Sequence, residues 1–465
     1  MARIYLLPAL WLALLIMPCP VSGQESRQPH VLFIVADDLR GDVMSVHGGP
    51  VPTPNLDRLA ASGSLFSRAT CGYPICHVSR SEMLSGRVLE AEATVSRKPV
   101  LFQPEWKLWP DVMREAGWHT VYVGKWHVRG TPWTRGYAET FGLYSAGGGR
   151  GAPVTLPHSS NGSPVTGYTG WTFKTNDNKP LLERGIGLMP DTDALIADGA
   201  LEALAARADK PLFLHVNFTA PHDPLHWPQG LEDKWAAESI ELPSNFRQEH
   251  PFPHGNEGSR DEIIVPAPRT AQAVRRERAV YYALVENIDT QVGRILQAIE
   301  PLGGLDNTLV IFTSDHGLAL GSHGLMGKQN QYEHTANVPL IIAGPGIPAN
   351  QRLQAQCALR DLFPTTCDLL QLSIPSTVQG KSLMPVLRGE QSEVHEAVFG
   401  YFTDTQRMIR TADGWKLIRY PQVNRTQMFH VAEDPQELND LASASEHQAQ
   451  RQRLEAALDK WLSER

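Results

Sequence analysis

The sequence has little positive charge and few cysteines, and it lacks internal repeats and low-complexity tracts. Its 42 lysines and arginines are outnumbered by 50 aspartates and glutamates, which gives a net charge of −8 at pH 7. This balance argues against nucleic acid as a partner. It also gives no general attraction for anions, so an anionic ligand must be held by a local cluster of cations. With 42% hydrophobic and 20% charged residues, the composition is that of an ordinary globular protein.

Only one long apolar run stands out, and it lies at the start of the chain. Arg3 gives a positive beginning, residues 4–17 are almost wholly apolar, and residues 21–23 are small. The run is too short for a comfortable membrane span, so we predict a signal peptide over residues 1–23 rather than a retained anchor. Cleavage after residue 23 predicts a secreted or periplasmic protein.

The five cysteines have different predicted roles. Cleavage of the signal peptide removes Cys19. An exported protein permits disulfides, and Cys357 and Cys367, ten residues apart, are a candidate pair. Cys76 stands apart from the others because a histidine, a serine and an arginine lie within the next four residues.

Short apolar runs rich in β-branched residues alternate with amphipathic or alanine-rich stretches. This alternation predicts an α/β protein, with a large parallel sheet and helices on both faces. The predicted strands span residues 30–36, 120–124, 211–218, 308–313 and 338–343. The predicted helices begin at residue 53 and span residues 108–116, 191–208 and 270–299.

The pattern changes after about residue 372. Short strands are predicted at residues 397–401, 408–411 and 415–420, with a hairpin at residues 412–414 and a helix over residues 445–462 that Ser445 caps. We therefore predict a main domain over residues 24–372 and a small antiparallel-sheet subdomain with one helix over residues 373–465. Residues 145–178 lack periodicity and are expected to form a long surface excursion.

Acidic residues follow two of the predicted strands. Asp37 and Asp38 come directly after the first strand, and Asp315 and His316 follow the strand at residues 308–313. Adjacent carboxylates repel unless a cation lies between them, and the carboxyl ends of parallel strands meet at one edge of the sheet. The pattern favours a hard cation, Ca²⁺ or Mg²⁺. The alternative is a solvated turn.

Three further segments carry basic side chains. Lys125 and His127 are two residues apart on an extended segment and so face the same side. Prolines on both sides of His222 and Asp223 hold that loop in one shape. Lys328 lies twelve residues after His316 and carries no meaning alone. Taken singly, each of these segments is also consistent with residues that have no catalytic or binding role.

The segment Cys76-His77-Val78-Ser79-Arg80, followed by Ser85-Gly86-Arg87, resembles the signature of the sulfatase family. That signature reads C-x-P-S-R and then T-G-R or S-G-R, so Val78 stands where the family usually has proline. The Gly-Lys-Trp-His segment that begins at residue 124 is a second recurrent sulfatase motif. The resemblance implies that a formylglycine-generating enzyme oxidises Cys76 to formylglycine, whose hydrate is the nucleophile.

The resemblance also implies an alkaline-phosphatase-like fold, a sulfatase catalytic domain over residues 24–372 and one bound Ca²⁺, with Mg²⁺ as the alternative. It implies a role for each matching residue: Asp37, Asp38, Asp315, His316 and the converted Cys76 at the metal, Arg80, Lys125 and Lys328 for the positive field, His127 at the nucleophile, and His222 at the leaving oxygen. Because export is predicted, a sulfated carbohydrate is the expected substrate. No nucleic acid and no membrane span is expected.

Three other interpretations stay open at this point. The first is a phosphodiesterase or phosphonate monoester hydrolase of the same superfamily. The second is a non-catalytic protein that binds sulfated glycans, if Val78 prevents conversion of Cys76. The third is an exported α/β protein in which these motifs are structural. Aromatic residues such as Tyr168 and Trp171 are expected at the rim of the pocket, where they pack or stack on sugars.

Overall fold

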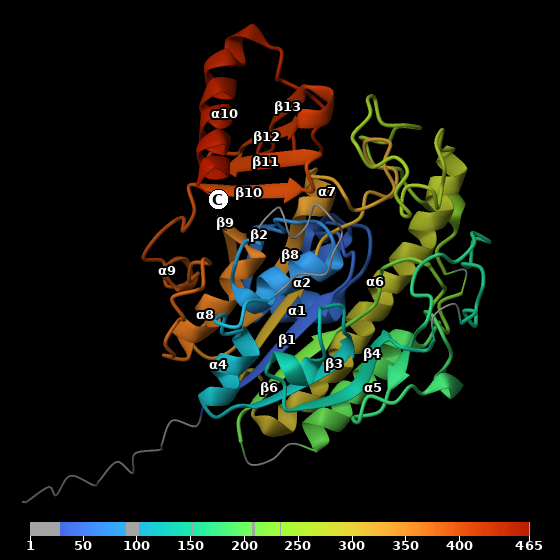
Figure 1. Cartoon of the computed structure of the whole chain (residues 1–465), viewed down its shortest axis with the longest axis vertical. Coiled ribbons are helices and arrows are strands. Elements are labelled where there is room, and N and C mark those ends of the chain that lie inside the picture. Colours follow the sequence, from blue (N-terminus) through green and yellow to red (C-terminus); the bar gives the residue numbers. More distant parts are fainter. Residues whose placement is uncertain (1–27, 90–101, 150–151, 207–209, 233, 465) are drawn as a thin grey trace, which may run out of the picture.

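The structure is a computed structural model that describes residues 28–89, 102–149, 152–206, 210–232 and 234–464. The predicted signal peptide lies outside the described residues. Figure 1 shows a large sheet covered by helices, with a smaller sheet and the last helix, α10, at one end.

The large sheet has nine strands in the order β5-β4-β3-β6-β1-β7-β8-β2-β9. Its strands are β1 (His30–Ala36), β2 (Gly63–Thr70), β3 (His119–Lys125), β4 (Glu139–Ala146), β5 (Trp171–Lys174), β6 (Leu212–Asn217), β7 (Thr308–Ser314), β8 (Asn337–Ala343) and β9 (Gln351–Ala358). Five of the neighbouring pairs are parallel, while β8 runs antiparallel to β7 and β2, and β5 to β4. The predicted α/β class with a mixed, mostly parallel sheet is thus confirmed.

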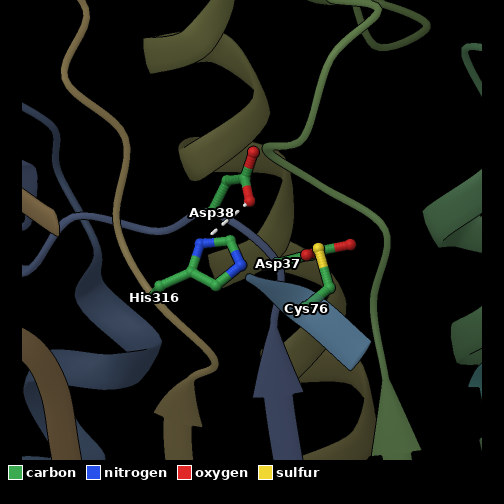
Figure 2. A group of neighbouring side chains, drawn as sticks. All are labelled: Asp37, Asp38, Cys76 and His316. Atoms are coloured by element: carbon green, nitrogen blue, oxygen red, sulfur yellow. Dashed lines mark ion pairs between the residues drawn. The ribbon is translucent and has the colours of Figure 1, made fainter. Parts of the chain in front are cut away.

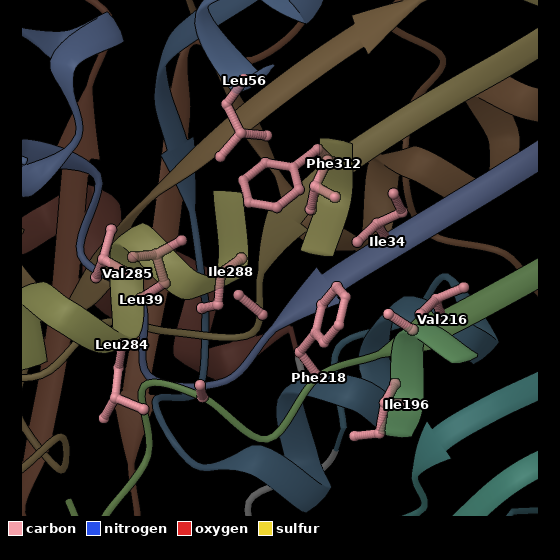
Figure 3. Packing of buried hydrophobic residues seen from close by; sticks show 14 of the residues in the cluster. Ile34, Leu39, Leu56, Ile196, Val216, Phe218, Leu284, Val285, Ile288 and Phe312 are labelled. Atoms are coloured by element: carbon pink, nitrogen blue, oxygen red, sulfur yellow. The ribbon is translucent and has the colours of Figure 1, made fainter. Parts of the chain in front are cut away.

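The two faces of the sheet are covered by different helices. The helices are α1 (Pro54–Ala61), α2 (Cys76–Ser85), α4 (Trp109–Glu115), α5 (Thr192–Ala205), α6 (Ala271–Ile299), α7 (Glu333–Ala336), α8 (Leu362–Leu369), α9 (Met384–Leu387) and α10 (Gln448–Ser463). Along β1, Leu32 and Ile34 join the core on the side of α1, α5 and α6 (Figure 3). Val31 and Phe33 join the core on the opposite side, with α4 and α8. Side chains alternate between faces along a strand, so a continuous apolar run is what a strand buried on both faces requires.

The second sheet has four antiparallel strands in sequence order, and α10 packs on it. Its strands are β10 (Ala397–Phe402), β11 (Gln406–Thr411), β12 (Trp415–Tyr420) and β13 (Arg425–His430). Gly414 turns the predicted β11–β12 hairpin with a φ of 88°. One detail of the prediction was wrong. Ser445 does not cap α10, because residues Ser445–His447 form a separate 3₁₀ turn before the helix begins at Gln448.

Four strands of the large sheet were missed by the sequence interpretation, namely β2, β4, β5 and β9. The edge strand β9 has exposed polar side chains at its start, and β5 has only four residues. Neither forms the continuous apolar run of a central strand. The excursion predicted over residues 145–178 therefore contains an ordered piece, since β5 pairs with β4.

The candidate disulfide between Cys357 and Cys367 is not formed. Both thiols are free and buried, as are those of Cys71 and Cys76. Cys357 lies in β9 and Cys367 in α8, and both side chains pack into the apolar core on the α4 and α8 side of the sheet. A free buried cysteine behaves as a small hydrophobic residue.

Candidate active site

Two acidic segments meet at the carboxyl ends of β1 and β7. In the parallel register Ala36 lies opposite Ser314, so the chain leaves both strands at the same level. The backbone N–H of Asp38 donates to Oδ1 of Asp315 at 3.2 Å. Asp38 has a φ of 70°, a left-handed conformation that few residues other than glycine adopt. The adjacent strands therefore bring together residues nearly 280 positions apart in the sequence.

Four side chains from these segments and from α2 form a compact group. Asp37, Asp38, Cys76 and His316 are all buried, and each offers a donor atom that lies within 4.8 Å of the other three (Figure 2). Nδ1 of His316 is 3.2 Å from Oδ1 of Asp38. Two carboxylates, an imidazole and a sulfur atom thus point into one small volume.

The donor chemistry of this group fits a divalent cation. Oδ1 of Asp37 and Nε2 of His316 are buried and have no hydrogen-bond partner. Such atoms are costly to bury unless something satisfies them. Burial lowers the pKa of His316 to about 3, so its ring is neutral, as a metal ligand must be. Two carboxylates favour a hard cation such as Ca²⁺ or Mg²⁺.

Asp315 lies beside this group and makes different contacts. Its Oδ2 accepts a hydrogen bond from Nε of Arg80 at 2.9 Å. Its Oδ1 accepts from the backbone N–H groups of Asp38 and His316, at 3.2 and 3.0 Å. The carboxylate is therefore shared between the guanidinium and the backbone of the other predicted ligands, and its role as a metal ligand stays a prediction.

Each carboxylate of the acidic pair has its own lysine. Nζ of Lys125, at the end of β3, forms an ion pair with Asp37, and the hydroxyl of Tyr168 donates to the same carboxylate at 2.9 Å. Nζ of Lys328 is 3.0 Å from both carboxylate oxygens of Asp38. All five side chains are buried. The negative charge of the pair is therefore balanced by one lysine at the end of β3 and by another in the loop that follows β7.

A glycine fixes the position of Lys125. Gly124 has a φ of 84°, and a Cβ atom at this position would lie 2.1 Å from the backbone oxygen of Asn217. Only glycine tolerates both conditions. Any other residue would push β3 away from β6 and withdraw Lys125 from Asp37.

His222 is held on both sides of its ring. Its Nε2 lies 2.7 Å from Nζ of Lys328. Its Nδ1 lies 2.5 Å from the backbone oxygen of Asp223 and 3.1 Å from its Oδ1. A lysine ammonium only donates, so Nε2 accepts and Nδ1 carries the proton. Arg260 pairs with the carboxylate of Asp223 in turn, with its Nη2 2.9 Å from Oδ1.

The helix that begins at Cys76 is fastened to the strand ends and covered by the second sheet. Oγ of Ser79 donates to the backbone oxygen of Asp315 at 2.7 Å. Val78 is buried in a cluster with Tyr401 and Phe402 of β10. Cys76 itself is 2% exposed, and burial raises the pKa of its thiol. A protonated thiol is a poor nucleophile.

His127 lies at the edge of the site, next to a cavity. Its ring centroid is 5.7 Å from that of His77 and 5.2 Å from that of Trp171. Its Nδ1 is buried without a partner. Burial lowers the pKa values of both His127 and His222 well below the usual value, and nearby lysines lower them further. Both rings are therefore neutral at pH 7 and able to accept a proton.

The structure thus gathers all ten residues singled out in the sequence, and it adds others. Tyr168, Asn217 and Asp223 contact them directly, and Arg260 reaches the site through its pair with Asp223. Tyr168 belongs to the aperiodic excursion and Arg260 to a long loop, and neither lies in a motif. Asp223 was visible beside His222, but its contact with Arg260 depends on the folded loop.

Comparison with known proteins agrees with this geometry. The profile of the family described as Sulfatase matches residues 29–372. A second profile, described as N-sulphoglucosamine sulphohydrolase, C-terminal, matches residues 321–464. An arylsulfatase of Clostridium perfringens is 28% identical over 469 residues, which cover 94% of this chain and 95% of the relative.

Two solved structures show the same fold. One is described as a complex with its substrate D-glucosamine-2-N,6-O-disulfate, with a TM-score of 0.73, 22% identity and coverage of 94% of this chain and 98% of the other. The other is a phosphonate monoester hydrolase of Agrobacterium radiobacter, with a TM-score of 0.73, 23% identity and coverage of 94% and 95%.

Within the described residues, no helix is both long and apolar enough to cross a bilayer. The family match covers all nine strands of the large sheet and every segment that contributes to the acidic group. The chain belongs to the sulfatase family, whose members are sulfuric ester hydrolases.

Proposed function

We propose that this protein is an exported sulfatase that removes sulfate from a sulfated carbohydrate. The observation that carries the proposal is the buried group of Asp37, Asp38, Cys76 and His316, with a lysine on each carboxylate. The site combines a place for one cation, a residue that the family converts to a nucleophile, and basic side chains for an anion. The carbohydrate is supported by the structural relative described as a complex with a disulfated glucosamine.

The cation would be held by Asp37, Asp38 and His316, with Asp315 and the side chain of residue 76 completing the set. When bound, Ca²⁺ or Mg²⁺ would supply positive charge that stabilises the negative oxygens of the sulfate group. The lysines already present have a complementary task. Lys125 and Lys328 each pair with one carboxylate, and a cation bound to these carboxylates would allow the ammonium groups to donate to sulfate oxygens instead.

Conversion of Cys76 to formylglycine would supply a hydroxyl nucleophile in place of a protonated thiol. The protein holds this residue at the first position of α2, where backbone N–H groups favour an anion. Arg80 is one turn further along, and its contacts with Asp315 and Asn217 fix the helix against the strand ends. The nucleophile and the anion site are therefore positioned by the same helix.

Proton transfer in the proposed reaction involves two histidines and one lysine. Lys328 carries the proton of the Lys328–His222 contact, so its ammonium is the donor toward the departing ester oxygen, while Nε2 of His222 supports it. His127 is neutral, and we assign it as the base that accepts a proton when sulfate is released from the enzyme. The sequence interpretation placed His222 at the leaving oxygen, and this assignment gives the donated proton to its neighbour Lys328.

The test is a paired measurement on one preparation. Mass spectrometry of the tryptic peptide from Ala69 to Arg80 shows whether Cys76 carries an aldehyde or a thiol. Hydrolysis of 4-nitrophenyl sulfate and release of sulfate from sulfated sugars are measured on the same sample. We expect an aldehyde together with activity that the Cys76→Ala variant lacks. Full activity with an intact thiol would overturn the assigned nucleophile.

Export and maturation are part of the same proposal. We propose that residues 1–23 are removed as a signal peptide and that a formylglycine-generating enzyme acts on Cys76. The expected mature N-terminus is Gln24, which N-terminal sequencing of protein secreted by its host would reveal. A retained Met1 would contradict export by this route.

A phosphonate monoester hydrolase is the second candidate, because one such enzyme shares the fold over 94% of this chain. Parallel assays on 4-nitrophenyl sulfate and 4-nitrophenyl phenylphosphonate separate the two. A higher kcat/KM for the phosphonate would favour this candidate. An unconverted Cys76 with affinity for sulfated glycans and no turnover would favour the non-catalytic binder.

A further inference from the structure

A cavity of about 560 Å³ opens beside the candidate active site. It is bounded by the segment from Trp126 to Pro132, by the end of β4, and by β5 with the turn that follows it. His127 and His77 form its inner wall, and His77 is the residue next to Cys76. The cavity therefore lies next to the candidate active site, with His77 and His127 between the two.

The charged side chains that line this cavity are basic. Among the described residues that line it, Arg129 and Lys174 are basic and none is acidic. The net charge of the whole chain is −8, so an acid-free lining is unusual for this surface. Arg129 is exposed, and within the part of the chain that the structure describes, neither basic residue forms an ion pair. Lys174 only donates to the side-chain oxygen of Asn178, at 3.1 Å.

A third cation strengthens the positive potential behind the lining. Nε of Arg135 donates to the backbone oxygen of Arg129 at 2.9 Å. The guanidinium of Arg135 stacks on Phe102, with 4.6 Å between its central carbon and the ring centroid. This contact holds the charge in place without neutralising it. An anion in the cavity would therefore meet the positive charge of Arg129 and Lys174, with Arg135 next to Arg129.

The cavity also offers an apolar wall. Trp171 is half-buried and packs edge-on against His127, with 5.2 Å between the ring centroids. Leu143 and Trp126 are buried beneath it. Aromatic and aliphatic walls with a few placed polar groups are typical of ligand sites. An indole face with cations at its edge suits a sugar ring that carries a negative group.

We infer that this cavity binds a second anionic group of the substrate, so that the enzyme prefers a sugar with two negative charges over one with a single sulfate. The inference rests on the proposed function. The scissile sulfate lies at the acidic group with Cys76, and the second anion lies between Lys174 and Arg129. The second anion is either another sulfate on the same sugar or the carboxylate of an adjoining uronic acid. Trp171 packs against the ring between them.

The test measures binding and does not depend on turnover. Protein purified with Cys76 as a thiol is titrated calorimetrically, in the presence of Ca²⁺, with three probes. These are N-acetyl-D-glucosamine 6-sulfate, D-glucosamine-2-N,6-O-disulfate, and a uronic acid linked to 6-sulfated N-acetyl-D-glucosamine. We expect at least fivefold tighter binding for one of the doubly charged probes, and which one it is identifies the second anion.

Substitutions of the two basic lining residues test whether the cavity causes the preference for a doubly charged probe. Lys174→Ala and Arg129→Ala should each weaken the preferred probe about two- to fivefold, as expected for partly exposed ion pairs, and the double variant about tenfold. Binding of the singly charged probe should not change. Lys179→Ala is the matched control, since this exposed lysine pairs with Asp177 and does not line the cavity.

The outcomes separate the two proposals. Equal affinity of the wild-type protein for all three probes, or an unchanged preference in the double variant, would overturn the subsite. If the mature enzyme releases no sulfate but the preference and its loss in the variants are observed, the proposed activity fails while the binding site stands. Thermal unfolding of each variant confirms that the fold is retained.

Discussion

Nε2 of His222 lies 2.7 Å from Nζ of Lys328, at the centre of the buried site. The contact fixes which partner holds the proton, because an ammonium donates and has no lone pair. It also links the loop that follows β6 to the loop that carries Lys328. In the proposed reaction, this pair donates a proton to the oxygen that leaves with negative charge.

The first prediction concerns this pair. Lys328→Ala and His222→Ala should each lower kcat by about 100-fold or more, in the range of a lost general acid. The loss should be larger for an alkyl sulfate, such as a sugar 6-sulfate, than for 4-nitrophenyl sulfate, because an alkoxide needs the proton more than a nitrophenolate does. Steady-state kinetics on both esters measures this difference. The same fold loss on both would argue against proton donation.

The second prediction concerns Asp223, which is a positioning residue. Its carboxylate accepts from Nδ1 of His222 and is paired with Arg260. Asp223→Asn should lower kcat about tenfold with little change in KM, because the negative charge that faces Nδ1 of His222 is lost while the backbone oxygen of residue 223 still accepts from it. Asp223→Glu should recover part of the loss if the carboxylate is what matters. Arg260→Lys serves as the comparison, and a purely structural role would lower stability in all three variants alike.

The third prediction concerns removal of the cation. Chelation should abolish activity and lower the unfolding temperature, and Ca²⁺ should restore both. At a free cation concentration about 100 times Kd, binding adds about 2.7 kcal/mol to the free energy of unfolding. Asp37→Asn should remove this Ca²⁺-dependent shift in the unfolding temperature, while the exposed control Asp177→Asn should keep it. A shift of unchanged size in Asp37→Asn would place the cation elsewhere.

The fourth prediction concerns the pH dependence of stability. Glu277, on α6, is buried, and burial raises its pKa to about 7 from an ordinary value near 4.5. The folded protein therefore binds this proton more tightly than the unfolded chain. The stabilisation is complete below pH 4.5 and is lost as the pH rises through 7. Above pH 7 the buried charge costs on the order of 3 kcal/mol.

Glu277→Gln should accordingly match the wild-type protein at pH 5 and unfold at a higher temperature at pH 8. Differential scanning calorimetry at both pH values gives the comparison. The exposed Glu202→Gln serves as the control, with the same chemical change and no burial. A constant difference between wild type and Glu277→Gln at the two pH values would show that the carboxyl does not titrate in this range.

The fifth prediction concerns Val78, which stands where related signatures have proline. Val78 lies in the first turn of α2, where its N–H donates to the backbone oxygen of Ile75 at 3.1 Å. Proline is tolerated in the first turn of a helix and fixes φ near about −65°. Val78→Pro should therefore fold and should raise the fraction of Cys76 that becomes an aldehyde. Mass spectrometry of the peptide that ends at Arg80 measures that fraction.

The central strands of the fold could be predicted from the sequence because they are buried on both faces. The run at residues 30–36 matches β1 residue for residue. The edge strands β5 and β9 could not be predicted, because half of their environment is solvent and their side chains are mixed. Their pairing is decided by neighbouring strands that lie far away in the sequence.

The candidate site was visible as separate short motifs, and their convergence followed from the parallel sheet. The ionic partners within the site were not visible. Lys125 pairs with Asp37 and Lys328 with Asp38, and nothing in the spacing decides between this pairing and its reverse. The contact of Tyr168 with Asp37 depends on how an aperiodic loop folds over the site, which periodicity does not encode.

The packing of β10 on α2 also limits the period during which Cys76 is accessible. Val78 is packed under Tyr401 and Phe402, and these residues emerge from the ribosome roughly 320 residues later, after roughly 15 to 65 seconds at ~5–20 residues per second. An enzyme that modifies Cys76 needs an open peptide, and the finished protein leaves that residue 2% exposed. The time available for the proposed modification is therefore limited by translation and folding, and slower synthesis would lengthen it.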